Sequence, residues 1–216
     1  MHERNLLIML VQEFLEPGFK TIEQIGGDKS SKSLSTHNLP TKLLIIDLEM
    51  SGPNPREHEV LDIGGVLASM EEGFPELTSW GSKVRPLHIG TGNIGALATV
   101  SYSSKKWRDS MSLEKAITNI SQIGHQSIIT GWGISQDLAF LNETYHRLKQ
   151  EWPFLKVAID IQNIAKKMLT RSEIDRLNLG HVADRLGIGR LGEHSALADA
   201  YTTYDVLTTL WKRATK

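Results

Sequence analysis

The sequence predicts an α/β fold in which helices flank a five-stranded mixed sheet, and three observations support this prediction. Short strand-like runs occupy residues 43–46, 59–68, 80–85, 127–130 and 157–160, and all of them except 80–85 are rich in leucine or β-branched residues, which are typical of strands. Short connections join the first three runs, which favours an antiparallel meander. The last two runs alternate with helical patterns, and we expect them to complete the sheet as parallel strands.

Helical periodicity supplies the flanking layers. Apolar residues recur at helical spacing in residues 112–123, 135–148, 161–168, 179–186 and 196–211. Ser112 and Ser135 precede two of these stripes and are expected to act as N-caps, and Gly187 ends a third. Residues 87–102 are glycine-rich without a clear period, which predicts a loop bordering the site.

Length and composition favour one catalytic-size domain. With 216 residues and 40% hydrophobic composition, the chain is long enough for one sizeable core and short for two. Residues 1–16 show the pattern of an amphipathic helix, which would pack on the domain or dock to a partner. Residues 26–42 are rich in Gly, Ser and Lys, as flexible linkers are. We therefore predict an N-terminal helix and flexible linker over residues 1–40 and a single domain over residues 41–216.

Charge and cysteine content limit the function classes. A net charge of -1 argues against a protein that coats nucleic acid by charge alone, although a local basic or metal-filled groove is compatible with it. Cysteine is absent, so a metal ion would need oxygen or imidazole ligands. The apolar segment 6–15 is too short to cross a bilayer, and we expect a cytoplasmic protein without a membrane span.

Two acids end the first predicted strand. Asp47 and Glu49 are two residues apart, so on an extended backbone both side chains leave the same face of the sheet. Like charges about 4 Å apart repel by roughly 4 kcal/mol at an effective dielectric near 20. A divalent metal ion between them would offset this repulsion. A strand that simply runs out into solvent is the alternative for this pattern alone.

Two further acids follow on other elements. Asp137 falls in the first turn of the helix after the fourth strand, where the helix dipole favours a carboxylate and the end of a strand favours a ligand site. Asp199 lies five residues after His194, and five helical residues would place the two side chains about 140° apart. We therefore expect His194 in a loop, Ser195 at the helix cap and Asp199 in the second turn.

These residues together resemble the DEDDh family of 3′-to-5′ exonucleases, which have the ribonuclease H-like fold. The family includes the proofreading subunit of the bacterial replicative polymerase, ribonuclease T and oligoribonuclease. The matching motifs are Asp47-Leu48-Glu49, Asp137 followed by 138–141, and His194-x-Ala196-x-x-Asp199, within a resemblance that spans roughly residues 43–210. Where many relatives have a His-Asn pair before the second motif, this chain has Trp132-Gly133. Substrate length and the choice between DNA and RNA therefore stay open.

The resemblance implies a mechanism and a set of partners. Asp47, Glu49 and Asp199 would ligate one Mg²⁺ or Mn²⁺ ion, and Asp47 and Asp137 would hold a second. His194 would accept the proton of the attacking water. The substrate would be a single-stranded DNA or RNA 3′ end, and a homodimer or a polymerase partner is open.

Two apolar residues are candidates for substrate contacts. Met50 could wedge against the terminal base, and Phe140 could line the same pocket. Packing in the core is the alternative for both. The main alternative for the whole chain is a non-catalytic nucleic-acid-binding or scaffold module of the same fold.

Overall fold

The computed structural model describes residues 41–190 and 195–215. Its sheet has the order β3-β2-β1-β4-β5. β2 pairs antiparallel with β1 and β3, whereas β4 pairs parallel with β1 and β5. The predicted mixed sheet with a three-stranded meander is therefore confirmed. The strands are β1 (Lys42–Met50), β2 (Val60–Ser69), β3 (Glu76–Lys83), β4 (Ile128–Gly131) and β5 (Ala158–Asp160).

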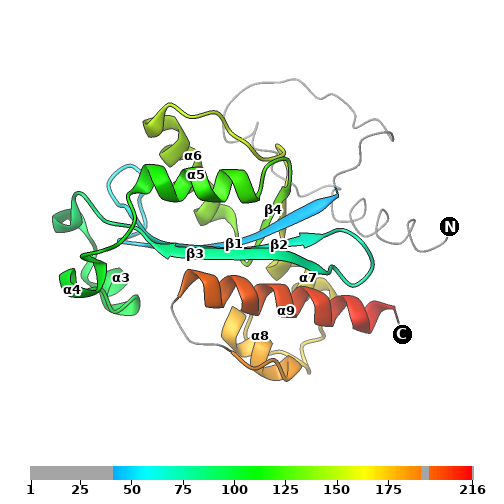
Figure 1. Ribbon diagram of the computed structural model, residues 1–216. Coiled ribbons are helices and arrows are strands. Elements are labelled where there is room, and N and C mark those ends of the chain that lie inside the picture. The colour runs from blue at the N-terminus through cyan, green and yellow to red at the C-terminus, as the bar shows by residue number, and fades with distance from the viewer. Residues whose placement is uncertain (1–40, 191–194, 216) are drawn as a thin grey trace.

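Helices cover both faces of this sheet. α5 (Leu113–Ile123) and α6 (Ser135–Leu148) lie on one face, and α7 (Ile161–Met168), α8 (Leu179–Leu186) and α9 (Ala196–Ala214) lie on the other (Figure 1). α9 runs beneath β1 to β3 and begins at the end of the sheet where β3 ends (Figure 1). In the described part of the chain, no helix combines the length and apolar character that a bilayer span requires.

Two hydrophobic cores follow from side-chain alternation along β1. Leu43 and Ile45 point to the face covered by α7, α8 and α9, where they join Val206 and Leu210. The alternate residues of β1 point to the opposite face and pack against α5 and α6. The second core includes Leu44, Ile46 and Leu48 of β1, Ile117 and Ile120 of α5, and Leu138 and Leu141 of α6. Because both faces are covered, β1 reads as a continuous apolar run until its acids.

The region between β3 and α5 differs from the prediction. The structure places helical segments η1 (Ile89–Thr91), α3 (Ile94–Thr99) and α4 (Ser104–Trp107) in or beside the predicted loop 87–102. Asn93 is the N-cap of α3, and its side chain accepts a hydrogen bond from the Ala96 backbone. α3 has only six residues, most of them apolar, so it is too short to show a helical alternation of apolar and polar residues.

Two element boundaries also differ. β3 begins at Glu76 rather than Trp80, because its first residues face solvent and show no apolar run. Ser135 is the first helical residue of α6 and Ile134 is the cap, without a side-chain hydrogen bond. The other predicted cap is confirmed: the side chain of Ser112 accepts a hydrogen bond from the Lys115 backbone at the start of α5.

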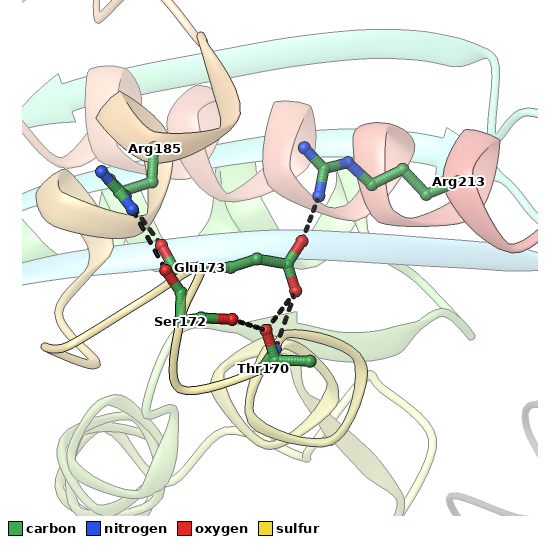
Figure 2. Close-up of polar contacts among 5 residues, drawn as sticks. All are labelled: Thr170, Ser172, Glu173, Arg185 and Arg213. Atoms are coloured by element: carbon green, nitrogen blue, oxygen red, sulfur yellow. Dashed lines mark hydrogen bonds and ion pairs between the residues drawn. The ribbon is translucent and has the colours of Figure 1, made fainter.

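The turn between α7 and α8 is held by hydrogen bonds, one of which comes from α9. Thr170 donates from its backbone and its hydroxyl to one carboxylate oxygen of Glu173, at 2.8 and 2.9 Å. Arg213 of α9 donates to the other oxygen, and Arg185 of α8 donates to the carbonyls of Ser172 and Glu173 (Figure 2). The turn therefore links three helices on the face of the sheet that carries α9.

Candidate active site

Strand alternation and pairing set the positions of the first two acids. Asp47 pairs with Gly64 of β2, and Glu49 pairs with Asp62. Paired residues and residues two apart on a strand share a face, so both acids point to the face that α9 covers. The apolar residue between them, Leu48, is buried in the opposite core.

α9 brings the third acid to this face. Asp199 lies in the first turn of α9 rather than the second, because the helix begins at Ala196. Carboxylate oxygens of Asp47, Glu49 and Asp199 all lie within 4.8 Å of one another. This separation is short enough for one cation to contact all three side chains.

Asp137 approaches the same strand from α6. It lies in the first turn of that helix, as predicted, and is 7% exposed. Its Oδ1 atom accepts a hydrogen bond of 3.0 Å from the backbone N–H of Leu48, the residue between the two strand acids. Asp137 therefore lies next to the three-acid group but outside it.

Burial and mutual repulsion raise the pKa values of these acids. Burial raises the pKa of Asp47 well above its ordinary value, and the charges of Asp137, Asp199 and Glu49 add to the increase. Burial, followed by the charge of Asp199, raises the pKa of Glu49 to about 7. Burial also raises the pKa of Asp137 to about 7, against hydrogen bonds that lower it.

The donor set fits a divalent cation. All the ligand atoms of the three-acid group are carboxylate oxygens, which hard cations such as Mg²⁺ and Mn²⁺ prefer. A bound cation would also favour the ionised form of each acid, which repulsion disfavours without it. The residues present are therefore compatible with the metal site predicted from the sequence.

A fifth acid, Asp62, lies near this group and was not among the residues predicted from the sequence. It is 6% exposed on β2, and its Oδ2 atom lies 3.4 Å from Nζ of Lys83. Burial raises its pKa, whereas Lys83 and hydrogen bonds to the backbone of Ile63 and Ala196 lower it. Asp62 thus contacts the first residue of α9, where Ser195 provides no side-chain cap. Its position inside the apolar run of β2 was the sequence feature that could have identified Asp62 as a candidate.

Two glycines allow α9 to lie close to the sheet. Gly64 of β2 pairs with Gly81 of β3, and both lie under the first turn of α9. A methyl group at Gly64 would overlap backbone atoms of Ala196 and Leu197. At Gly81 it would lie 2.8 Å from Cβ of Leu197. This close approach brings Asp199 to the acids of β1.

We expect Gly64→Ala to reduce the stability of the protein, because the added methyl group forces the first turn of α9 away from the sheet. The loss of stability should be about 1–3 kcal/mol, as for other overpacked sites, measured by urea unfolding. Gly90→Ala is the control, since nothing lies within 4 Å of a methyl group there. Equal stability of the two variants would contradict the proposed close packing.

The remaining candidates have different environments. Met50 is half-buried at the end of β1 and packs against the core shared by α5 and α6. Phe140 is 2% exposed within that core, so packing accounts for its position. His194 lies outside the described residues. Trp107 is buried and donates from Nε1 to the carbonyl of Leu61 at 2.9 Å.

Comparison with known families agrees with this geometry. The model of the RNase T family, described as exonucleases, matches residues 44–207. The chain belongs to this exonuclease family. The match includes Asp47, Glu49, Asp137 and Asp199, and it confirms the family resemblance drawn from the sequence motifs. No curated protein sequence matches this exonuclease-family chain.

Solved structures share the fold of this exonuclease-family chain. Exonuclease I of E. coli in complex with a dT13 oligonucleotide matches with a TM-score of 0.69 and 16% identity, over 81% of this chain and 42% of that chain. The zinc-bound form of the E. coli exonuclease I complex with single-stranded DNA matches with a TM-score of 0.70 and 14% identity, over 82% and 42%. The chain spans less than half of those structures. At these identities the likeness shows the ribonuclease H-like fold alone.

Proposed function

We infer that the protein is a metal-dependent 3′-to-5′ exonuclease that converts single-stranded DNA or RNA ends to 5′-nucleoside monophosphates. The observation that carries this proposal is the convergence of Asp47, Glu49 and Asp199 within 4.8 Å, with Asp137 beside them. Family membership supports nuclease chemistry. The complexes of E. coli exonuclease I with single-stranded DNA support a single-stranded substrate.

Each acid has a role in the proposal. Asp47, Glu49 and Asp199 would hold one divalent cation, and Asp47 and Asp137 would hold a second. When bound at such a site, Mg²⁺ or Mn²⁺ would activate a water and stabilise the leaving 3′ oxygen. His194 accepts the proton of the attacking water.

Met50 contacts the terminal base from the end of β1. Phe140 supports the pocket from within the core.

A degradation assay tests this function. The protein is incubated with Mn²⁺ and single-stranded DNA or RNA that carries a label at the 5′ or the 3′ end. A 3′-to-5′ exonuclease releases labelled mononucleotide at once from the 3′-labelled strand, whereas the 5′-labelled strand shortens in steps. Absence of mononucleotides from both DNA and RNA would instead favour the non-catalytic binding module. Cleavage of a circular strand would indicate an endonuclease.

Metal binding should stabilise the protein more strongly at high pH. Glu49 and Asp137, with pKa values near 7, keep protons that the unfolded chain releases at lower pH. The free energy of unfolding of the metal-free protein therefore falls as pH rises from about 4 to 7. Mg²⁺ binds the ionised acids, so we expect it to raise the melting temperature more at about pH 8 than at about pH 6. An equal metal-induced shift at both pH values would contradict this prediction.

A further inference from the structure

A basic groove lies at the exposed edge of the sheet, next to the end of β3. Its volume is about 560 Å³, and its charged lining residues are Lys83, Lys106, Lys115 and Asp109. Three positive charges and one negative charge give this groove a formal charge of +2, although the whole chain carries -1. Serines contribute most of the uncharged lining. This chemistry favours an anion.

The groove adjoins the acid group through Lys83. Asp62, the strand partner of Glu49, lies 3.4 Å from Nζ of Lys83. The same Nζ atom lies 4.6 Å from the centroid of the Trp107 ring, at the end of α4. Lys106 directly precedes Trp107 in α4. A short series of contacts therefore leads from the proposed metal site into the groove.

The backbone beneath the groove is fixed to the sheet. Met111 forms a parallel bridge with Val84, directly after β3. The Met111 backbone donates to the carbonyl of Lys83, and the Arg85 backbone donates to the carbonyl of Met111, at 3.2 and 2.8 Å. α5 begins two residues later, and Lys115 lies in its first turn. The groove thus has a preformed base between β3, α4 and α5, at the same end of the sheet as the start of α9 (Figure 1).

Lys106 and Lys115 are available to a ligand. Both residues are exposed. The Nζ atom of Lys106 makes one long hydrogen bond of 3.5 Å to the Ser101 carbonyl. Lys83, in contrast, is held by Asp62 and Trp107. The two exposed lysines are therefore the groove residues that can follow a flexible phosphate chain.

We propose that this groove binds the phosphate backbone of the single-stranded substrate on the 5′ side of the scissile bond, through Lys106 and Lys115. The proposal rests on the exonuclease function above and extends it to substrate length: strands of several nucleotides reach the groove, whereas a dinucleotide does not. Binding through lysine and phosphate is independent of base sequence and weakens with salt.

The test is the double variant Lys106→Gln/Lys115→Gln, compared with wild type and with Lys156→Gln/Lys212→Gln. The control lysines are exposed, carry the same charge and belong to the end of the sheet opposite the acids. We expect the ratio of kcat/KM on a single-stranded 20-mer to that on a dinucleotide to fall about tenfold in the groove variant. The control variant should keep the wild-type ratio.

Fluorescence anisotropy with a labelled 20-mer in EDTA measures binding without hydrolysis. Each phosphate contact on a single strand contributes about 0.7 to the slope of log K against log salt, so losing two should reduce the slope by about 1.4. If the groove variant keeps both the wild-type salt slope and the wild-type kcat/KM ratio, the proposal that the groove binds the substrate is wrong. If the wild-type protein binds the 20-mer but releases no mononucleotide, the exonuclease proposal fails. The salt slope of the groove variant still tests whether the groove binds the phosphate backbone.

Discussion

Asp199→Asn is expected to lower the rate of mononucleotide release by at least about a hundredfold, which corresponds to roughly 3 kcal/mol of lost transition-state stabilisation. The reason is the position of Asp199 within 4.8 Å of both strand acids, where it completes the three-acid group. Asparagine keeps the shape of the side chain but removes its negative charge. The rate is measured on 3′-labelled single strands with saturating Mn²⁺.

The stability of the same variant separates loss of the site from misfolding. Asp199 raises the pKa values of Asp47 and Glu49, so its removal relieves repulsion in the metal-free protein. We therefore expect Asp199→Asn to melt at a higher temperature than wild type in EDTA. Asp205→Asn, the same change on the same helix, should keep the wild-type rate. A slow and less stable Asp199 variant would contradict the site assignment.

His194→Ala should also reduce mononucleotide release by about a hundredfold, the scale expected for loss of a general base. The acids proposed to hold the cations are unchanged in this variant. We therefore expect its melting temperature to respond to Mn²⁺ as that of wild type does. The measurement is a rate profile against pH at saturating Mn²⁺, in which the part of the acid-side loss of activity that belongs to the imidazole should disappear, while the part caused by protonation of Glu49 and Asp137 remains.

The control for this variant is His125→Ala, since His125 is exposed and precedes β4. It should keep both the rate and its pH profile. Addition of free imidazole should restore part of the rate in His194→Ala. A wild-type rate in His194→Ala would place the proton acceptor elsewhere, and loss of the Mn²⁺ response would instead make His194 part of the metal site.

Local patterns were sufficient to find the four acids that the structure brings together and the mixed sheet with its three-stranded meander, whereas the metal-binding role of these acids stays a prediction. Asp47 and Glu49 follow a continuous apolar run, and Asp137 and Asp199 lie in the first turns of helices whose apolar stripes are clear. Each of these signals lies within a few residues of the acid itself. The roles of His194, Met50 and Phe140 stay predictions.

Features that depend on strand register could not be predicted. Gly64 and Gly81 lie side by side only because β2 pairs with β3 at that register, and no sequence pattern indicates that α9 covers them. Asp62 contacts the start of α9 from a distant part of the chain. The lysines of the groove come together through the bridge between Val84 and Met111.

The position of α9 determines when the proposed catalytic centre can form during synthesis. β1 and β2 are made first, but Asp199 and the helix that covers their apolar face come from the last part of the described chain. A ribosome-bound chain that has not yet exposed α9 therefore has an incomplete ligand set. Under the proposed function, such a nascent chain would be unable to cut nucleic acid, including the messenger being translated, until α9 docks.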